Sequence, residues 1–321
     1  MKKVTASASM ALALCVSIAS AQAQGLLGAL AKGSAKPGPA PVEEKDVVSG
    51  KVKLDPDAGY ILVSGAARQI GMFLRVPDDA SRAEWEKTRQ AAFVKEHKRW
   101  DWAMESWHRH VKLAQKMKDA EVPVQPVEPK IETFVHEPLE LRDLVSFGYQ
   151  YVYAKGDPVS YLMRVKPGSY VWYGHVAGGN SLPAGGVCMC MGSVRFEAKP
   201  GVVTNLGDSL DTLPHWGEDM DVQRLAAKDA AEKRVAEGKL PAFALVVGTP
   251  AYPVPASLRN WPMVQPEFYA NAKINNFFAI PISRLAPIPG VLAYHRDTVV
   301  DVRTGQDVAS PTLVSRQKPK L

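Results

Sequence analysis

The chain has 321 residues, of which 46% are hydrophobic and 22% charged, so it can bury one large core or two modest ones. Its formal net charge is +6, but Lys2 and Lys3 belong to an N-terminal segment that we expect to be removed. Without them 37 basic residues face 33 acidic ones, which argues against a nucleic-acid-binding domain. The three cysteines exclude a scaffold stapled by several disulfides.

The first 23 residues have the pattern of a secretory signal peptide. Lys2 and Lys3 are followed by an apolar stretch over residues 10–18 and by the small-x-small sequence 21–23. This order predicts cleavage after Ala23 and export to the periplasm or the cell surface. No later stretch approaches the roughly 20 apolar residues that span a bilayer, so we expect no transmembrane segment in the mature chain. Residues 24–46, rich in Gly, Ala and Pro, predict a flexible leader.

Residues 47–215 predict a β body. Three runs rich in β-branched and apolar residues open it, and later strands are bounded by the turns Lys166-Pro167-Gly168 and Lys199-Pro200-Gly201. The predicted strands cover residues 48–54, 59–64, 69–76, 131–135, 144–154, 159–165, 170–176 and 187–198.

A helical insertion over residues 79–121 interrupts this body. There is no Gly or Pro from Ser81 to Asp119, and Ser81 with Glu84 fits a capping box. Apolar residues recur at helical spacing through this stretch, at Phe93, Trp100, Met104, Trp107 and Val111. The pattern predicts either one long helix or a helix broken near residues 96–98 into a hairpin.

The C-terminal region, residues 216–303, is expected to complete the body. It contains a predicted short helix over residues 219–238, strands at 243–247, 277–282 and 291–302, and a Pro- and aromatic-rich segment at 248–276 that wraps the body. Residues 304–321 predict a disordered basic tail. The predicted fold class is therefore mainly β, an antiparallel immunoglobulin-like or prealbumin-like β-sandwich with a long charged helical insertion and a short second helix.

Three stretches resemble a group of exported bacterial β-sandwich domains of unknown function. They are Tyr60 to Val63, Lys166 to Tyr170 and Arg195 to Gly207, in which strands end in a Pro-Gly turn before tyrosine or close on Leu-Gly. The resemblance covers about a third of the chain. It implies the β-sandwich fold and no catalytic residues.

A soft-metal site is one candidate for chemistry. On a strand Cys188 and Cys190 would face one side, and His175 on a neighbouring strand could add a nitrogen ligand. Copper or zinc binds such ligands. Core packing or a disulfide between the two cysteines is the alternative, because Cys is among the most buried residues and the spacing fits no established zinc motif.

The tryptophans of the helical insertion are the second candidate. Trp100, Trp102 and Trp107 lie in residues 81–118, where ten basic residues face five acidic ones. Indole rings and basic side chains together suit an interfacial or partner-binding helix. The alternative is that the indoles pack on the β body or within a hairpin.

The sequence gives no catalytic constellation. The serines lack a Gly-x-Ser-x-Gly context, and His215, His295 and Asp297 fall in different segments. We therefore expect an exported, non-enzymatic, envelope-associated binding or structural module without a cofactor, which contacts an envelope component or another envelope protein through its helix. The alternatives are a copper- or zinc-binding protein and an envelope hydrolase.

Overall fold

The computed structural model describes residues 42–65, 68–117, 121–134, 136–148, 152–156, 158–179, 182–212, 233, 237 and 252–310. The predicted signal peptide, most of the leader, the strand at 243–247, the tail beyond residue 310 and nearly all of the short helix at 219–238 lie outside these residues. Two compact units are distinguished: Leu74–Leu144, which we call the arm, and the rest of the chain, which we call the body.

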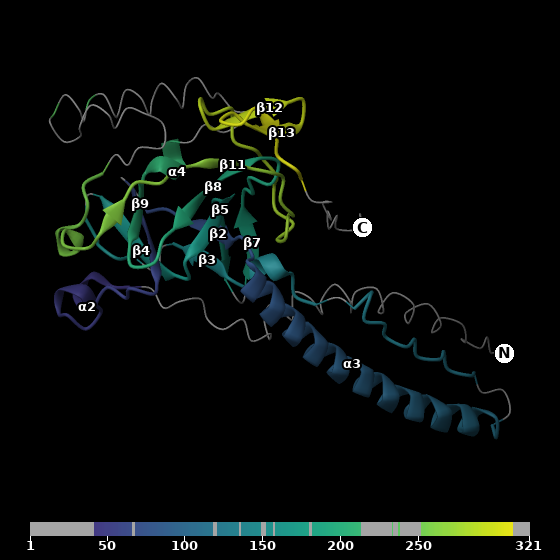
Figure 1. The fold of residues 1–321 in the computed structure, drawn as a ribbon. Coiled ribbons are helices and arrows are strands. Elements are labelled where there is room, and N and C mark those ends of the chain that lie inside the picture. Colours follow the sequence, from purple (N-terminus) through teal and green to yellow (C-terminus); the bar gives the residue numbers. More distant parts are fainter. Residues whose placement is uncertain are drawn as a thin grey trace, which may run out of the picture. The chain divides into compact units, whose positions relative to one another are not determined.

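The described part of the chain is mainly β, with one long helix (Figure 1). A four-stranded sheet has the order β10 (Met263–Val264), β9 (Val203–Gly207), β1 (Gly59–Gly65), β4 (Val159–Val165). A five-stranded sheet has the order β11 (Tyr269–Asn271), β8 (Ser193–Ala198), β5 (Gly168–Gly174), β2 (Gly71–Arg75), β3 (Leu144–Phe147). The smaller sheets are β12 (Leu292–His295), β13 (Thr298–Asp301), β14 (Gln306–Asp307) and the pair β6 (Val176–Gly179), β7 (Leu182–Gly186).

The four-stranded sheet is mixed in direction. β1 pairs antiparallel with β4 from Gly59 opposite Val165 to Gly65 opposite Val159. On its other side β1 runs parallel to β9, and β9 runs parallel to β10. The sequence predicted an antiparallel framework. The parallel pairs were missed because β1, β9 and β10 are far apart in the chain, so no local sequence signal indicates that they pair.

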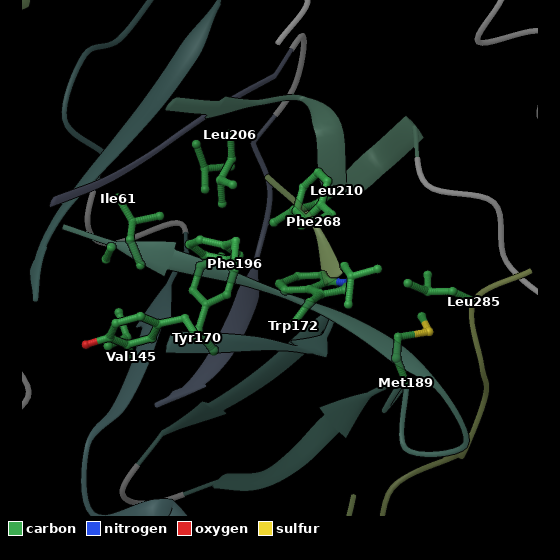
Figure 2. Packing of buried hydrophobic residues seen from close by; sticks show 14 of the residues in the cluster. Ile61, Val145, Tyr170, Trp172, Met189, Phe196, Leu206, Leu210, Phe268 and Leu285 are labelled. Atoms are coloured by element: carbon green, nitrogen blue, oxygen red, sulfur yellow. The ribbon is translucent and has the colours of Figure 1, made fainter. Parts of the chain in front are cut away.

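The larger core cluster is formed by residues from both large sheets. Ile61 and Val63 of β1 belong to the same cluster as Phe73 of β2, Trp172 of β5 and Phe196 of β8. Figure 2 shows several of these side chains converging. The ring centroid of Phe73 lies 5.3 Å from that of Trp172 and 5.5 Å from that of Phe196. Aromatic rings at such separations add to the stabilisation from burial.

A second cluster corrects the predicted start of the body. Val42 is buried beside Tyr60, Leu62 and Leu258, so the last residues of the predicted leader pack into the body. Residues 44–48 form the short helix α2 (Glu44–Val48), and the predicted strand at 48–54 is wrong. α2 is held in place by the Glu44 carboxylate, which accepts a hydrogen bond from Ser257 at 2.8 Å.

Four further predictions are corrected. Residues 131–133 form turns, and residues 277–282 contribute only an isolated bridge between Ile282 and Cys188. The predicted disordered tail begins too early, because Gln306 and Asp307 form β14. The predicted final strand at 291–302 is instead the hairpin of β12 and β13. The remaining short helices are η1 (Leu139–Leu141), α4 (Ser209–Thr212) and η3 (Ala256–Leu258).

The arm contains one unbroken helix, α3 (Asp79–Ala114), so the helix is not interrupted near residues 96–98. Its N-cap is Asp78, whose carboxylate accepts a hydrogen bond from the backbone N–H of Ser81 at 2.7 Å. The predicted cap at Ser81 is therefore wrong by three residues. α3 and the chain that follows it connect β2 to β3, which are neighbours in the five-stranded sheet.

Candidate partner-binding surface

After α3 the chain runs back beside the helix (Figure 1). We call residues 121–134 and 136–143 the return segment. The Trp107 indole N–H donates a hydrogen bond to the Pro123 carbonyl at 2.8 Å, and Trp100 donates to the Pro126 carbonyl at 3.3 Å. Nearer the start of the helix, Trp85 donates to the Glu137 carbonyl at 2.7 Å. These indoles hold the return segment along the helix.

The spacing of tryptophans and prolines explains this pairing. Pro123, Pro126 and Pro129 recur every third residue, which suits an extended polyproline-like backbone that advances about 9 Å in three residues. Trp100 and Trp107 are seven residues apart, and an α-helix advances about 10 Å in seven residues. Two successive indoles therefore reach two successive proline carbonyls. Such an extended backbone leaves its carbonyls free of internal hydrogen bonds, so they are available as acceptors.

Further contacts continue the same seam. The ring of Phe93 packs edge-on against that of Phe134 at 5.6 Å, and His97 Nε2 lies 3.5 Å from a carboxylate oxygen of Glu128. Near the start of the helix the return segment reaches a different side of α3, where Arg142 contacts the Glu84 carboxylate at 2.6 Å. The return segment thus covers one face of α3, which is the intramolecular alternative that the sequence left open for Trp100 and Trp107.

Trp102 differs from these two tryptophans. At 100° per residue it lies about 160° around the helix from Trp100 and about 140° from Trp107. Its side chain is 77% exposed. The three tryptophans that the sequence grouped as partner-binding residues therefore separate into two that hold the return segment and one that faces away from it.

Basic side chains surround Trp102. We call Lys95, Lys98, Trp102, Arg109 and Leu113 the outer face, because all lie within about 40° of Trp102 around the helix. All five are exposed. Among the described residues, Lys95, Lys98 and Arg109 have no carboxylate within ion-pair distance. The closest carboxylate in angle between residues 91 and 113 is Glu105, about 60° away. The outer face therefore carries three cations around an exposed indole.

An ion-pair network fixes the base of the arm. The buried Arg75 guanidinium contacts Asp78 at 2.6 Å, Ser81 Oγ at 2.8 Å and Asp143 at 3.4 Å. Asp78 precedes α3 and Asp143 ends the return segment, so one arginine joins both ends of the arm. The hydrogen bond from Arg75, and then the one from Ser81, hold the pKa of Asp78 well below its usual value.

Comparison with known proteins adds no relative: no family model, no curated protein and no solved structure matches the chain. The candidate site therefore has to be judged on its own geometry.

The predicted soft-metal residues lie in the body. Cys188 and Cys190 are buried and form a disulfide with each other, the alternative that the sequence analysis kept beside the metal site. In this oxidised form neither sulfur is a thiolate, which is the species that binds metal. His175 Nδ1 lies 3.2 Å from the Ile70 carbonyl oxygen. Within the described ranges, no group of three His, Cys, Asp or Glu side chains is placed to hold a metal ion. The soft-metal site stays a prediction, limited to the reduced protein.

Two of the serines that lack a Gly-x-Ser-x-Gly context, Ser160 and Ser193, have structural partners in the core. Ser160 Oγ lies 3.0 Å from Ser64 Oγ, and both residues are buried in neighbouring strands. Ser193 is buried and donates a hydrogen bond to the Trp172 carbonyl. These hydroxyls therefore cross-link strands in the core.

Two features of the site escaped the sequence analysis. The first is the period of three in the prolines at 123, 126 and 129, which predicts an extended segment with one repeating face. The role of Arg75 was missed because its partners lie 3 and 68 residues away. Asp78, three residues before Ser81, was the available signal for the helix start.

Proposed function

We propose that this chain is a non-enzymatic binding or structural module of the cell envelope, exported through its N-terminal segment, and that its contact surface is the outer face of α3. The single observation that carries this proposal is the exposure of Trp102. A tryptophan buries 150–250 Å² when it is packed, and an indole left in water within a basic rim is typical of a contact residue.

The arrangement of the arm supports the same function. The return segment already occupies the opposite face of α3, so the outer face is not needed to stabilise the hairpin. The Arg75 network ties both ends of the arm to each other, which gives the helix a defined start. A rigid helix with an exposed aromatic anchor suits binding better than a loop does, because less conformational freedom is lost on association.

We propose further that the two large sheets are the layers of a β-sandwich. The shared core cluster supports this arrangement, since it takes residues from β1 and β4 of one sheet and from β2, β5 and β8 of the other. The body then serves as the scaffold that presents the arm.

The test is co-sedimentation of the purified protein with envelope fragments from the organism that carries the gene. Trp102→Ala should lower the bound fraction several-fold while the far-UV circular dichroism and the melting temperature stay unchanged. Val48→Ala is the matched control, because Val48 is also an exposed apolar residue and lies in the body. Equal binding by wild type and Trp102→Ala would refute the proposed contact surface.

A further inference from the structure

Exposed apolar side chains are concentrated in one stretch of sequence, from the last turn of α3 to the start of the return segment. Leu113, Met117, Val122, Val124 and Val127 are each more than half exposed, and Val124 is 93% exposed. We call these five residues the arm tip. They fall within 15 residues of sequence and make up five of the eleven large hydrophobic residues that are exposed in the described part of the chain. A cluster of this kind marks an interaction site, since single exposed apolar residues are otherwise scattered.

Cations lie beside the arm tip. Lys112 and Lys116 flank Leu113 and are exposed, and Arg109 of the outer face lies one turn earlier. The outer face leads from Lys95 to Leu113, over about 27 Å of helix at 1.5 Å per residue. Leu113 belongs to both sets, so the outer face, with its indole and its row of lysine and arginine, ends at the apolar side chains of the arm tip.

We propose that this surface, the arm tip together with the outer face, binds the surface of a bilayer that contains anionic phospholipid. The proposal rests on the proposed function and names the partner of the same site. In the bound state the apolar side chains of the arm tip enter the boundary between headgroups and acyl chains, Trp102 lies at headgroup depth, and Lys98 and Arg109 contact lipid phosphates. α3 lies on the membrane, and among the described residues no helix is long and apolar enough to cross one.

Charge and shape favour a lipid surface over a second copy of the chain. Two outer faces brought together would oppose three cations to three cations without an intervening carboxylate. The outer face is also a convex helix surface, whereas sugars and other small ligands are ordinarily bound in pockets. The headgroups of an anionic bilayer are mobile and can adapt to a convex helix surface. Lysine and arginine side chains reach the lipid phosphates while their methylene groups remain over the apolar region.

The experiment is co-sedimentation of the full chain with two kinds of vesicle, phosphatidylcholine alone and phosphatidylcholine mixed with phosphatidylglycerol. We expect binding to the mixed vesicles only, with affinity falling as salt is raised. Each basic residue near an anionic surface is worth about fivefold in affinity, so Lys98→Glu with Arg109→Glu should weaken binding by more than about tenfold. Lys53→Glu with Lys199→Glu is the control with the same change in net charge at exposed body positions.

The arm tip is tested in the same assay. Met117→Gln with Val124→Gln should weaken binding several-fold, whereas Val48→Gln should leave it unchanged. Brominated lipid should quench the fluorescence of wild type more than that of Trp102→Phe, because bromine quenches only indoles that reach the membrane. The variants change exposed side chains, and unchanged circular dichroism confirms that each is folded.

The outcomes separate this inference from the proposed function. Trp102-dependent binding to envelope fragments without binding to anionic vesicles would overturn the lipid inference and leave the contact surface standing. Absence of binding to both the envelope fragments and the anionic vesicles would overturn the inference and the proposed function together. Vesicle binding that is unchanged by the substitutions at Lys98, Arg109 and the arm tip would also overturn the inference. Self-association of the chain would overturn it as well, if the molecular mass rises with protein concentration and the same arm variants abolish that rise.

Discussion

Replacing Trp107 with alanine should open the arm, and replacing Trp102 should not. Trp107 is partly buried against the return segment and donates a hydrogen bond to Pro123. Half of the area that a packed tryptophan buries is about 100 Å², which we take as the part of Trp107 that lies against the return segment. At about 25 cal/mol per Å² that burial contributes about 2.5 kcal/mol, and the hydrogen bond adds about 1 kcal/mol. The expected loss is therefore about 3.5 kcal/mol. For Trp102, 77% exposed, it is below about 1 kcal/mol.

Hydrogen exchange of the α3 backbone amides measures this difference directly. An amphipathic surface helix depends on packing more than on its own propensity, so freeing the return segment lowers the protection of the whole helix. A loss of about 3.5 kcal/mol corresponds to an acceleration of exchange by about 400-fold. Trp102→Ala is the matched control, since it removes the same side chain from the other face. Equal protection in the two variants, or no change in Trp107→Ala, would refute the assignment of Trp107 to the hairpin.

Three other perturbations test the rest of the structure. Gly71→Ala should lower the free energy of unfolding in urea by about 1–3 kcal/mol, because a Cβ there would lie 2.5 Å from ring atoms of Phe147 and Trp172. Gly156→Ala is the control and should be neutral, since no atom lies within 4 Å of its Cβ. Equal urea midpoints for the two variants would contradict this packing. Because Asp78 has a lowered pKa in the folded protein, its contribution to stability is present above about pH 4 and is lost as the pH falls further, so α3 should lose protection on acidification more steeply in wild type than in Asp78→Asn; parallel profiles would count against the Arg75 network. Thiol titration of the denatured, unreduced protein with peptide mapping should find residues 188 and 190 joined, and free thiols at both would return the metal prediction to consideration.

The strands that the sequence predicted well are those with local signals at both ends. β5 combines aromatic and β-branched residues with the Lys-Pro-Gly turn before it. The end of β8 is marked by the second such turn, whose Gly201 has φ +67°, a conformation that disfavours other residues. The predicted start of that strand at residue 187 is wrong, because β8 begins at Ser193 and leaves Cys188 and Cys190 outside it. The failures are stretches whose conformation depends on distant partners. Residues 48–54 have strand-like composition, but Val52 and Leu54 pack against the second core cluster without joining a sheet.

The candidate surface was predicted only in part, for a related physical reason. The sequence shows that the insertion is helical, basic and rich in tryptophan, because these are properties of composition and period. It does not show which indoles are covered, since that depends on the register between α3 and the return segment. With the helical period and the proline period considered together, Trp100 and Trp107 would have been separated from Trp102 before any coordinates were known.

The arm leaves the five-stranded sheet at β2 and re-enters it at β3, its immediate neighbour. In topological terms it is an enlarged connection between two neighbouring strands, and the cost of closing a loop rises by only about 0.6 kcal/mol for each doubling of its length. Shortening the helix by whole heptads, with three residues removed from the return segment for each, should keep the indoles opposite proline carbonyls. The same scaffold could thus carry arms of different reach, and one such arm could be transplanted onto an unrelated hairpin.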